Sequence, residues 1–135
     1  MNSNIILITF LVLFALAAAN ELKSHKPARN HKIYEDCMKE SGASVAQLEA
    51  LKKGDFNSID NKAKCFLKCL EDNKGILTNG MPNEAGIRKK IHAPPAGNGV
   101  SKDLLAKCNG LKGADECDTA YQIYKCFMQE KVPLI

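Results

Sequence analysis

The stretch that decides the fold is Lys64-Cys65-Phe66-Leu67-Lys68-Cys69-Leu70. At about 100° per residue in an α-helix, its apolar residues and both cysteines cover a continuous arc of about 200°. The remaining arc is predicted to face solvent and holds Lys64, Lys68, Glu71 and Asp72. Two thiols on one face of a helix bond to neighbouring segments rather than to each other. We therefore predict a central helix that disulfides attach to two other segments.

An uncharged apolar run from Ile5 to Ala18 opens the chain and ends in small residues. It is too short to span a bilayer comfortably, and its end suits signal peptidase, so we interpret residues 1–19 as a secretory signal. An N-terminal membrane anchor is the alternative. The remaining residues, 20–135, are predicted to form one domain. They contain all six cysteines, an even number that is typical of a disulfide framework in a secreted protein.

Apolar residues recur at helical spacing along most of the mature chain, and no stretch shows convincing strand alternation. The predicted fold class is therefore all-α, a compact domain of six helices. Residues 20–29, with Pro27, are predicted to be a loose leader, and 76–82 and 94–99 are predicted loops. The predicted helices span residues 30–41, the segment between Ser44 and Gly54, the central segment from Ser58 or Asp60 to about Gly75, residues 82–92, the segment from Ser101 to Gly110 or Gly113, and residues 116–131.

Two of these helices carry more detailed expectations. In the second, Ser44 and Gln47 form a predicted capping box, and Val45 belongs to the apolar stripe with Leu48 and Leu51. In the fourth, Pro82 is predicted to lie in the first turn.

The cysteines are separated by 27, 3, 38, 8 and 8 residues. Six cysteines allow fifteen pairings, and spacing alone does not choose among them. Parallel Cβ atoms exclude a bond between Cys65 and Cys69, and Cys117 and Cys126 lie on opposite sides of the last helix and must bond to different partners. Several pairings remain open on these grounds.

This order of spacings resembles the insect odorant-binding protein family, in its six-cysteine pheromone and general-odorant type. Lys64-Cys65-Phe66, Gly54-Asp55-Phe56 and the residues from Tyr121 to Phe127 support the resemblance, which extends from Cys37 to Cys126. It implies an interlocked pairing, which here would be Cys37–Cys69, Cys65–Cys117 and Cys108–Cys126. It also implies helices arranged around an apolar cavity, and a secreted carrier that delivers small hydrophobic ligands to a chemosensory receptor at a membrane. The expected carrier has no cofactor and is a monomer or a weak homodimer.

Residues on the inner faces of different helices are the predicted lining of this cavity. They are Leu51, Phe56, Leu67, Leu70, Ile76, Ile87, Ile91, Leu105, Tyr121, Tyr124, Phe127 and Leu134. One of the two tyrosines is further predicted to donate a hydrogen bond to a ligand oxygen, because a buried phenol needs a partner. The tail from Val132 to Ile135 either closes over the pocket as a short lid or frays in solvent. A domain of this length does not need three disulfides for stability, so a further hypothesis is that they hold a hollow core.

Other functions have less support in the sequence. The histidines, His25, His31 and His92, are scattered and no Cys-x2-Cys pair is present, so no metal site is expected. No nucleophile motif indicates an enzyme. The net charge of +4 comes without aromatic residues among the basic clusters, so nucleic-acid binding is not expected. His31 and His92 are either pH sensors or exposed side chains. The alternative function is that of a secreted interaction or defence protein acting on a protein or membrane partner.

Overall fold

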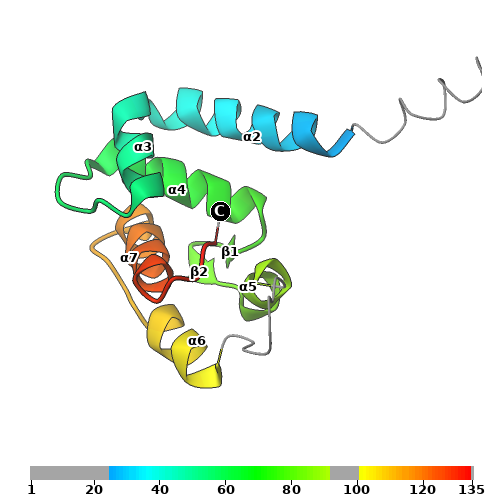
Figure 1. Ribbon diagram of the computed structural model, residues 1–135, viewed down its shortest axis with the longest axis vertical. Coiled ribbons are helices and arrows are strands. Elements are labelled where there is room, and N and C mark those ends of the chain that lie inside the picture. Colours follow the sequence, from blue (N-terminus) through cyan, green and yellow to red (C-terminus); the bar gives the residue numbers. More distant parts are fainter. Residues whose placement is uncertain (1–24, 92–100, 135) are drawn as a thin grey trace, which may run out of the picture. The chain divides into compact units, whose positions relative to one another are not determined.

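The computed structural model describes residues 25–91 and 101–134. The chain divides into two units, residues 1–32 and 33–135, and α2 crosses the boundary between them. The predicted signal, residues 1–19, and the predicted loop 94–99 lie outside the described residues. The elements in chain order are α2 (His25–Ser41), α3 (Val45–Lys53), α4 (Asn61–Asn73), β1 (Leu77–Thr78), β2 (Met81–Pro82), α5 (Glu84–Lys90), α6 (Lys102–Asn109) and α7 (Glu116–Gln129) (Figure 1).

The central helix of the second unit is α4, as predicted. Asp60 caps its first turn, where the carboxylate accepts a 2.8 Å hydrogen bond from the Ala63 amide. Phe66, Leu67 and Leu70 are buried on its inner face. This face packs chiefly against α7, which in turn contacts α6 (Figure 1). The fold is all-α, and its core lies between α4 and α7.

Three disulfides join these helices. Cys37–Cys69 connects α2 to α4, Cys65–Cys117 connects α4 to α7, and Cys108–Cys126 connects α6 to α7. They are the pairs that the family resemblance implies. Because α4 and α7 each carry two of the bonds, this pair of helices forms the frame to which α2 and α6 are attached.

Helix α2 begins at His25, so the prediction of a loose leader through residue 29 is wrong over its last five positions. Pro27 is accommodated because it lies in the first turn, where a backbone N–H has no intrahelical acceptor. Further along the helix, the Tyr34 ring meets the Phe66 ring edge to face, with centroids 5.0 Å apart. This contact and the first disulfide hold the second half of α2 against α4.

Helix α3 has the predicted bounds but only half of the predicted capping box. Ser44 Oγ accepts from the Gln47 amide, and Gly54 ends the helix in a left-handed conformation with φ 74°. The Gln47 side chain turns away instead: its Nε2 donates to the Ser58 carbonyl at 2.7 Å, and its Oε1 accepts from the Asp60 amide at 3.0 Å. It therefore ties α3 to the start of α4. Val45 is 59% exposed and does not belong to the apolar stripe.

The predicted loop between α4 and α5 contains a short antiparallel hairpin. Leu77 pairs with Pro82 and Thr78 with Met81, while Asn79 and Gly80 have φ of 53° and 71°. Two successive positive φ angles on Asn-Gly are typical of the tight turn that matches the twist of a hairpin. Pro82 therefore lies in β2 and not in a helix, and the fourth helix starts later than predicted, capped by Asn83.

Helices α6 and α7 begin close to their predicted positions. Ser101 caps α6, which ends at Gly110, and Asp115 caps α7. Helix α7 ends two residues before the predicted position, and Lys131 then takes a φ of 59°. The Val132 amide bonds back to the Phe127 carbonyl at 2.8 Å, and Leu134 is only 3% exposed. The tail folds back onto the core, so the alternative in which Leu134 frays into solvent is not what the structure shows.

Candidate functional site

The residues predicted from the sequence to line a cavity lie together in one apolar cluster. All of them are buried except Phe56 and Ile91, which are half-buried at its edge. They come from α3, α4, α5, α6, α7, the segments beside them and the C-terminal tail. Side chains from segments far apart in the sequence thus meet inside the frame that the disulfides hold.

The two tyrosines of α7 already have hydrogen-bond partners. Tyr124 donates its hydroxyl proton to the Leu51 carbonyl, and Tyr121 donates to the Phe56 carbonyl, both at 3.2 Å. The Phe56 ring packs edge to face against both phenols, with centroids 6.0 and 6.3 Å apart. Burial, with a smaller effect of Glu71, raises the pKa of Tyr124 to about 12, so its proton is firmly held. In this structure neither hydroxyl is available as a donor to a ligand.

Glu71 is a charged residue type in a buried position. It was predicted to face solvent, but it is 0% exposed, and neither carboxyl oxygen has a hydrogen-bond partner among the described residues. Burial, and secondarily the charge of Asp72, raises its pKa well above the usual 4.5, against a smaller opposing effect of Lys74. The carboxyl is therefore held in its neutral form over a wider pH range than an exposed one.

The position of Glu71 on α4 gives the physical reason for its burial. It follows Leu67 by four residues and Ala63 by eight, so it continues a row of side chains that are 0% exposed. Its charge favoured solvent, whereas the packing of α4 against α7 fixed the row inside the core. The row was the signal in the sequence that identifies the residue.

A set of charged pairs borders the core where α4 meets α7. Lys64 Nζ lies 2.6 Å from Asp118 Oδ1 and 4.8 Å from the centre of the Tyr121 ring. Lys68 bridges Asp72 at 3.0 Å and Glu116 at 3.3 Å. The hydrogen bond from Lys64 lowers the pKa of the Asp118 carboxyl. None of these ion pairs includes Glu71.

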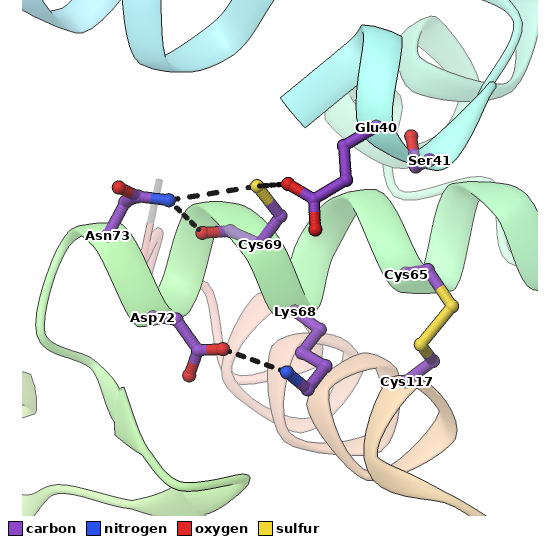
Figure 2. Close-up of a pocket in the computed structure, with 8 residues that line it drawn as sticks. All are labelled: Glu40, Ser41, Cys65, Lys68, Cys69, Asp72, Asn73 and Cys117. Carbon is purple, nitrogen blue, oxygen red and sulfur yellow. Dashed lines mark hydrogen bonds and ion pairs between the residues drawn. A yellow bond between two sulfur atoms is a disulfide. The ribbon is translucent and has the colours of Figure 1, made fainter. Parts of the chain in front are cut away.

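A pocket of about 380 Å³, lined by charged and polar side chains together with three cysteines, lies along α4 between α2 and α7 (Figure 2). Figure 2 shows the Cys65–Cys117 disulfide and the Lys68–Asp72 ion pair in its wall, with Asn73 donating to the Cys69 carbonyl at 2.9 Å. None of the residues predicted to line a cavity lines this pocket or two others on the described part of the chain, one beside Met81 and Leu111 and one beside Leu77 and Asn79.

Two further observations concern metals and membranes. Among the described residues, no three side chains of the kinds that ligate metals gather in one place. Within the same residues, no helix has both the length and the apolar character needed to cross a membrane. His31 is exposed, and His92 lies outside the described residues.

Comparison with known proteins places these features in context. Residues 19–130 match the model of the PBP/GOBP family. General odorant-binding protein 56a of Drosophila melanogaster is 29% identical over 131 residues, which cover 94% of this chain and 92% of that one. General odorant-binding protein 69a of the same species is 30% identical over 129 residues, which cover 90% and 83%.

A solved structure shows the same fold. It is the fatty acid binding protein OBP56a from the oral disk of the blowfly Phormia regina, which is 30% identical to this chain and superposes with a TM-score of 0.64. The match covers 81% of this chain and 94% of the blowfly protein.

Proposed function

Because the chain belongs to the PBP/GOBP family of insect odorant-binding proteins, we propose that it is a secreted carrier of small hydrophobic ligands, such as odorants or fatty-acid-like molecules. It would solubilise its ligand in an extracellular fluid and deliver it to a chemosensory receptor. The proposal assigns binding and transport to the protein, without a chemical step or a cofactor.

The observation that carries the proposal is the convergence of apolar side chains from helices α2 to α7 and the tail within a disulfide-linked frame. Each methylene group that a ligand transfers from water to such a site contributes about 0.8 kcal/mol. Affinity for a homologous series should therefore rise about fourfold with each added methylene, until the ligand fills the available length. Binding of this kind needs little beyond apolar surface and one polar contact.

Native mass spectrometry of the purified protein tests the proposal directly. The panel consists of straight-chain alcohols and fatty acids of increasing length, and displacement of a fluorescent apolar probe gives their affinities. We expect one ligand per chain and the stepwise gain in affinity. The same spectra report whether the carrier is a monomer or a weak homodimer.

A pair of leucines provides the matched control. Leu105 is 2% exposed in the apolar cluster, whereas Leu111 beyond the same helix is 36% exposed. Leu105→Ala should change affinity across the whole panel, and Leu111→Ala should leave it as in the wild type. Absence of any complex over the full panel would contradict the carrier proposal and favour an interaction or defence protein.

A further inference from the structure

Glu71 is an uncommon feature in an apolar core. Of the residues that the structure describes, it is the only polar one that is buried as a whole, and both of its carboxyl oxygens lack hydrogen-bond partners. A buried polar group without a partner costs about 1–3 kcal/mol. Native structures keep such groups rarely, and each one requires a physical explanation.

Within residues 25–91 and 101–134, no group donates a hydrogen bond to the Glu71 carboxyl or accepts one from it. Leu67 and Leu70 on the same helix are 0% and 3% exposed. The titratable groups that act on it or respond to it are Asp72 and Lys74 on or beside α4, and Tyr124 from α7. The Tyr124 hydroxyl already donates a hydrogen bond to the Leu51 carbonyl, and Lys74 makes no hydrogen bond to either carboxyl oxygen of Glu71.

The chemistry of a neutral carboxyl determines which group would satisfy it. It offers one O–H donor and one carbonyl acceptor. An alcohol also has one donor and acceptor lone pairs, so a single hydroxyl can complete both halves. An ether or ester accepts only and would leave the Glu71 carbonyl unpaired. An ionised fatty acid cannot donate either, and it would add a charge to an apolar site.

We propose that Glu71 is the polar contact of the ligand site and that it selects hydrophobic ligands that end in a hydroxyl group. This inference rests on the proposed function, since it requires that the apolar cluster receives a ligand. It deepens that function by naming the class of ligand, and it concerns a residue of α4 that the sequence pattern had placed in solvent.

The test compares three ligands with the same chain length: a straight-chain alcohol, its methyl ether and the corresponding carboxylate at neutral pH. The wild-type protein should bind the alcohol about tenfold more tightly than the ether, and the carboxylate should bind more weakly than the alcohol. Glu71→Leu should bring the ratio of alcohol to ether close to one. Glu71→Gln should keep the preference, because an amide also has a donor and an acceptor.

The matched control changes an exposed glutamate in the same way. Glu49 lies on the outer face of α3, and Glu49→Leu should leave all three affinities as in the wild type. A preference for the alcohol that survives in Glu71→Leu would overturn the inference and leave the carrier function standing. Failure of the wild type to bind any of the three ligands would instead overturn both.

A spectroscopic measurement makes the test independent of how the variants fold. With ¹³C-labelled glutamate, the side-chain carboxyl resonance of Glu71 is assigned by its absence from the Glu71→Gln spectrum. If that variant does not fold, the assignment is made by through-bond experiments on the wild type. The resonance should move when the wild-type protein binds the alcohol and move much less with the ether. An unchanged resonance on saturation with the alcohol would overturn the inference.

Discussion

The Glu71 side chain ties the stability of the protein to pH. Its pKa in the folded state lies well above the usual 4.5, because the buried carboxyl resists ionisation. Between those two pKa values the native state holds a proton that the unfolded chain has released. The free energy of unfolding therefore falls as the pH rises through this window, by about 1.4 kcal/mol per pH unit. Below this pH window Glu71 is protonated in both the folded and the unfolded state, and none of this free energy of unfolding has been lost.

Replacement of Glu71 with glutamine should remove that dependence, because the amide does not titrate. We expect the difference in free energy of unfolding between wild type and Glu71→Gln to shift in favour of the variant as the pH is raised from about 5 to about 8. Urea denaturation at intervals over this range measures it. Glu49→Gln, at an exposed position, should follow the wild type. Parallel curves for wild type and Glu71→Gln would contradict the raised pKa.

Individual residues differ in how far the sequence predicts their role. The burial of Tyr121 and Tyr124 follows from their place in the apolar arc of α7, yet the acceptors of their protons do not, because the Leu51 and Phe56 carbonyls lie 73 and 65 positions away in the chain. The prediction that Glu71 faces solvent is wrong for a different reason. Helical periodicity places it at the edge of the arc predicted to face solvent, next to Leu67, and the packing of α4 against α7 brings that edge into the core.

Among the elements, α5 depends on its contact with the turn that follows α4. The Gly86 backbone lies so close to Gly75 that a Cβ atom at position 86 would fall 1.6 Å from the Gly75 carbonyl oxygen. A glycine that weakens the helix by itself is thus what allows the two segments to approach. The same segment places Ile87 in the core at 0% exposure.

Gly86→Ala should therefore destabilise the protein, although alanine has a higher helix propensity than glycine. In an open helix the change would stabilise by about 1 kcal/mol, but here the forced separation of two backbones should destabilise by about 1–3 kcal/mol. Thermal unfolding, followed by circular dichroism, gives the sign. Lys89→Ala on the exposed side of the same helix should stay within about 0.5 kcal/mol of the wild type. A more stable Gly86→Ala protein would show that the close approach does not hold.

Elements with strong local signals were predicted well, and those set by tertiary contacts were not. Ser44 and Gly54 fix the bounds of α3 locally, since both act within one turn of the helix. The hairpin before α5 has a local signal too, in Asn79-Gly80, but its strands are too short for alternation to show. The Gln47 side chain could bond back to Ser44 in a capping box or forward to the start of α4. It bonds to Ser58 and Asp60, which the sequence of α3 alone does not indicate.

At the scale of the whole folded unit, residues 33–135, the disulfides and the apolar cluster act together. The Cys65–Cys117 bond closes a loop of 52 residues, and Cys108–Cys126 closes one of 18. In the chain-entropy model each such bond stabilises by about 3–4 kcal/mol. The helical spacing of apolar residues predicts the all-α class and the family resemblance implies the pairing of the cysteines, whereas the sequence predicts no single position for the tail.

The tail offers the last prediction, because Leu134 covers the apolar cluster from outside any helix. Lys131 reverses the chain, the Val132 amide anchors it to α7, and Leu134 is 3% exposed. If this segment closes the ligand site, Leu134→Ala should accelerate both entry and release of a bound ligand. If Leu134 is only a packing residue of the core, Leu134→Ala should instead lower the free energy of unfolding by about 2–5 kcal/mol, without a matching change in the rates of ligand entry and release.

Stopped-flow displacement of a fluorescent ligand separates the two roles. For a lid, the association and dissociation rates should rise together by several-fold, so the dissociation constant changes less than either rate. Truncation after Val132 should reproduce the effect, and Leu111→Ala, at a leucine that is 36% exposed, should not. Unchanged rates in both tail variants would exclude a lid and leave Leu134 as a packing residue. Gating by the tail would then be ruled out, and access to the cluster would have to pass between the helices that the disulfides join.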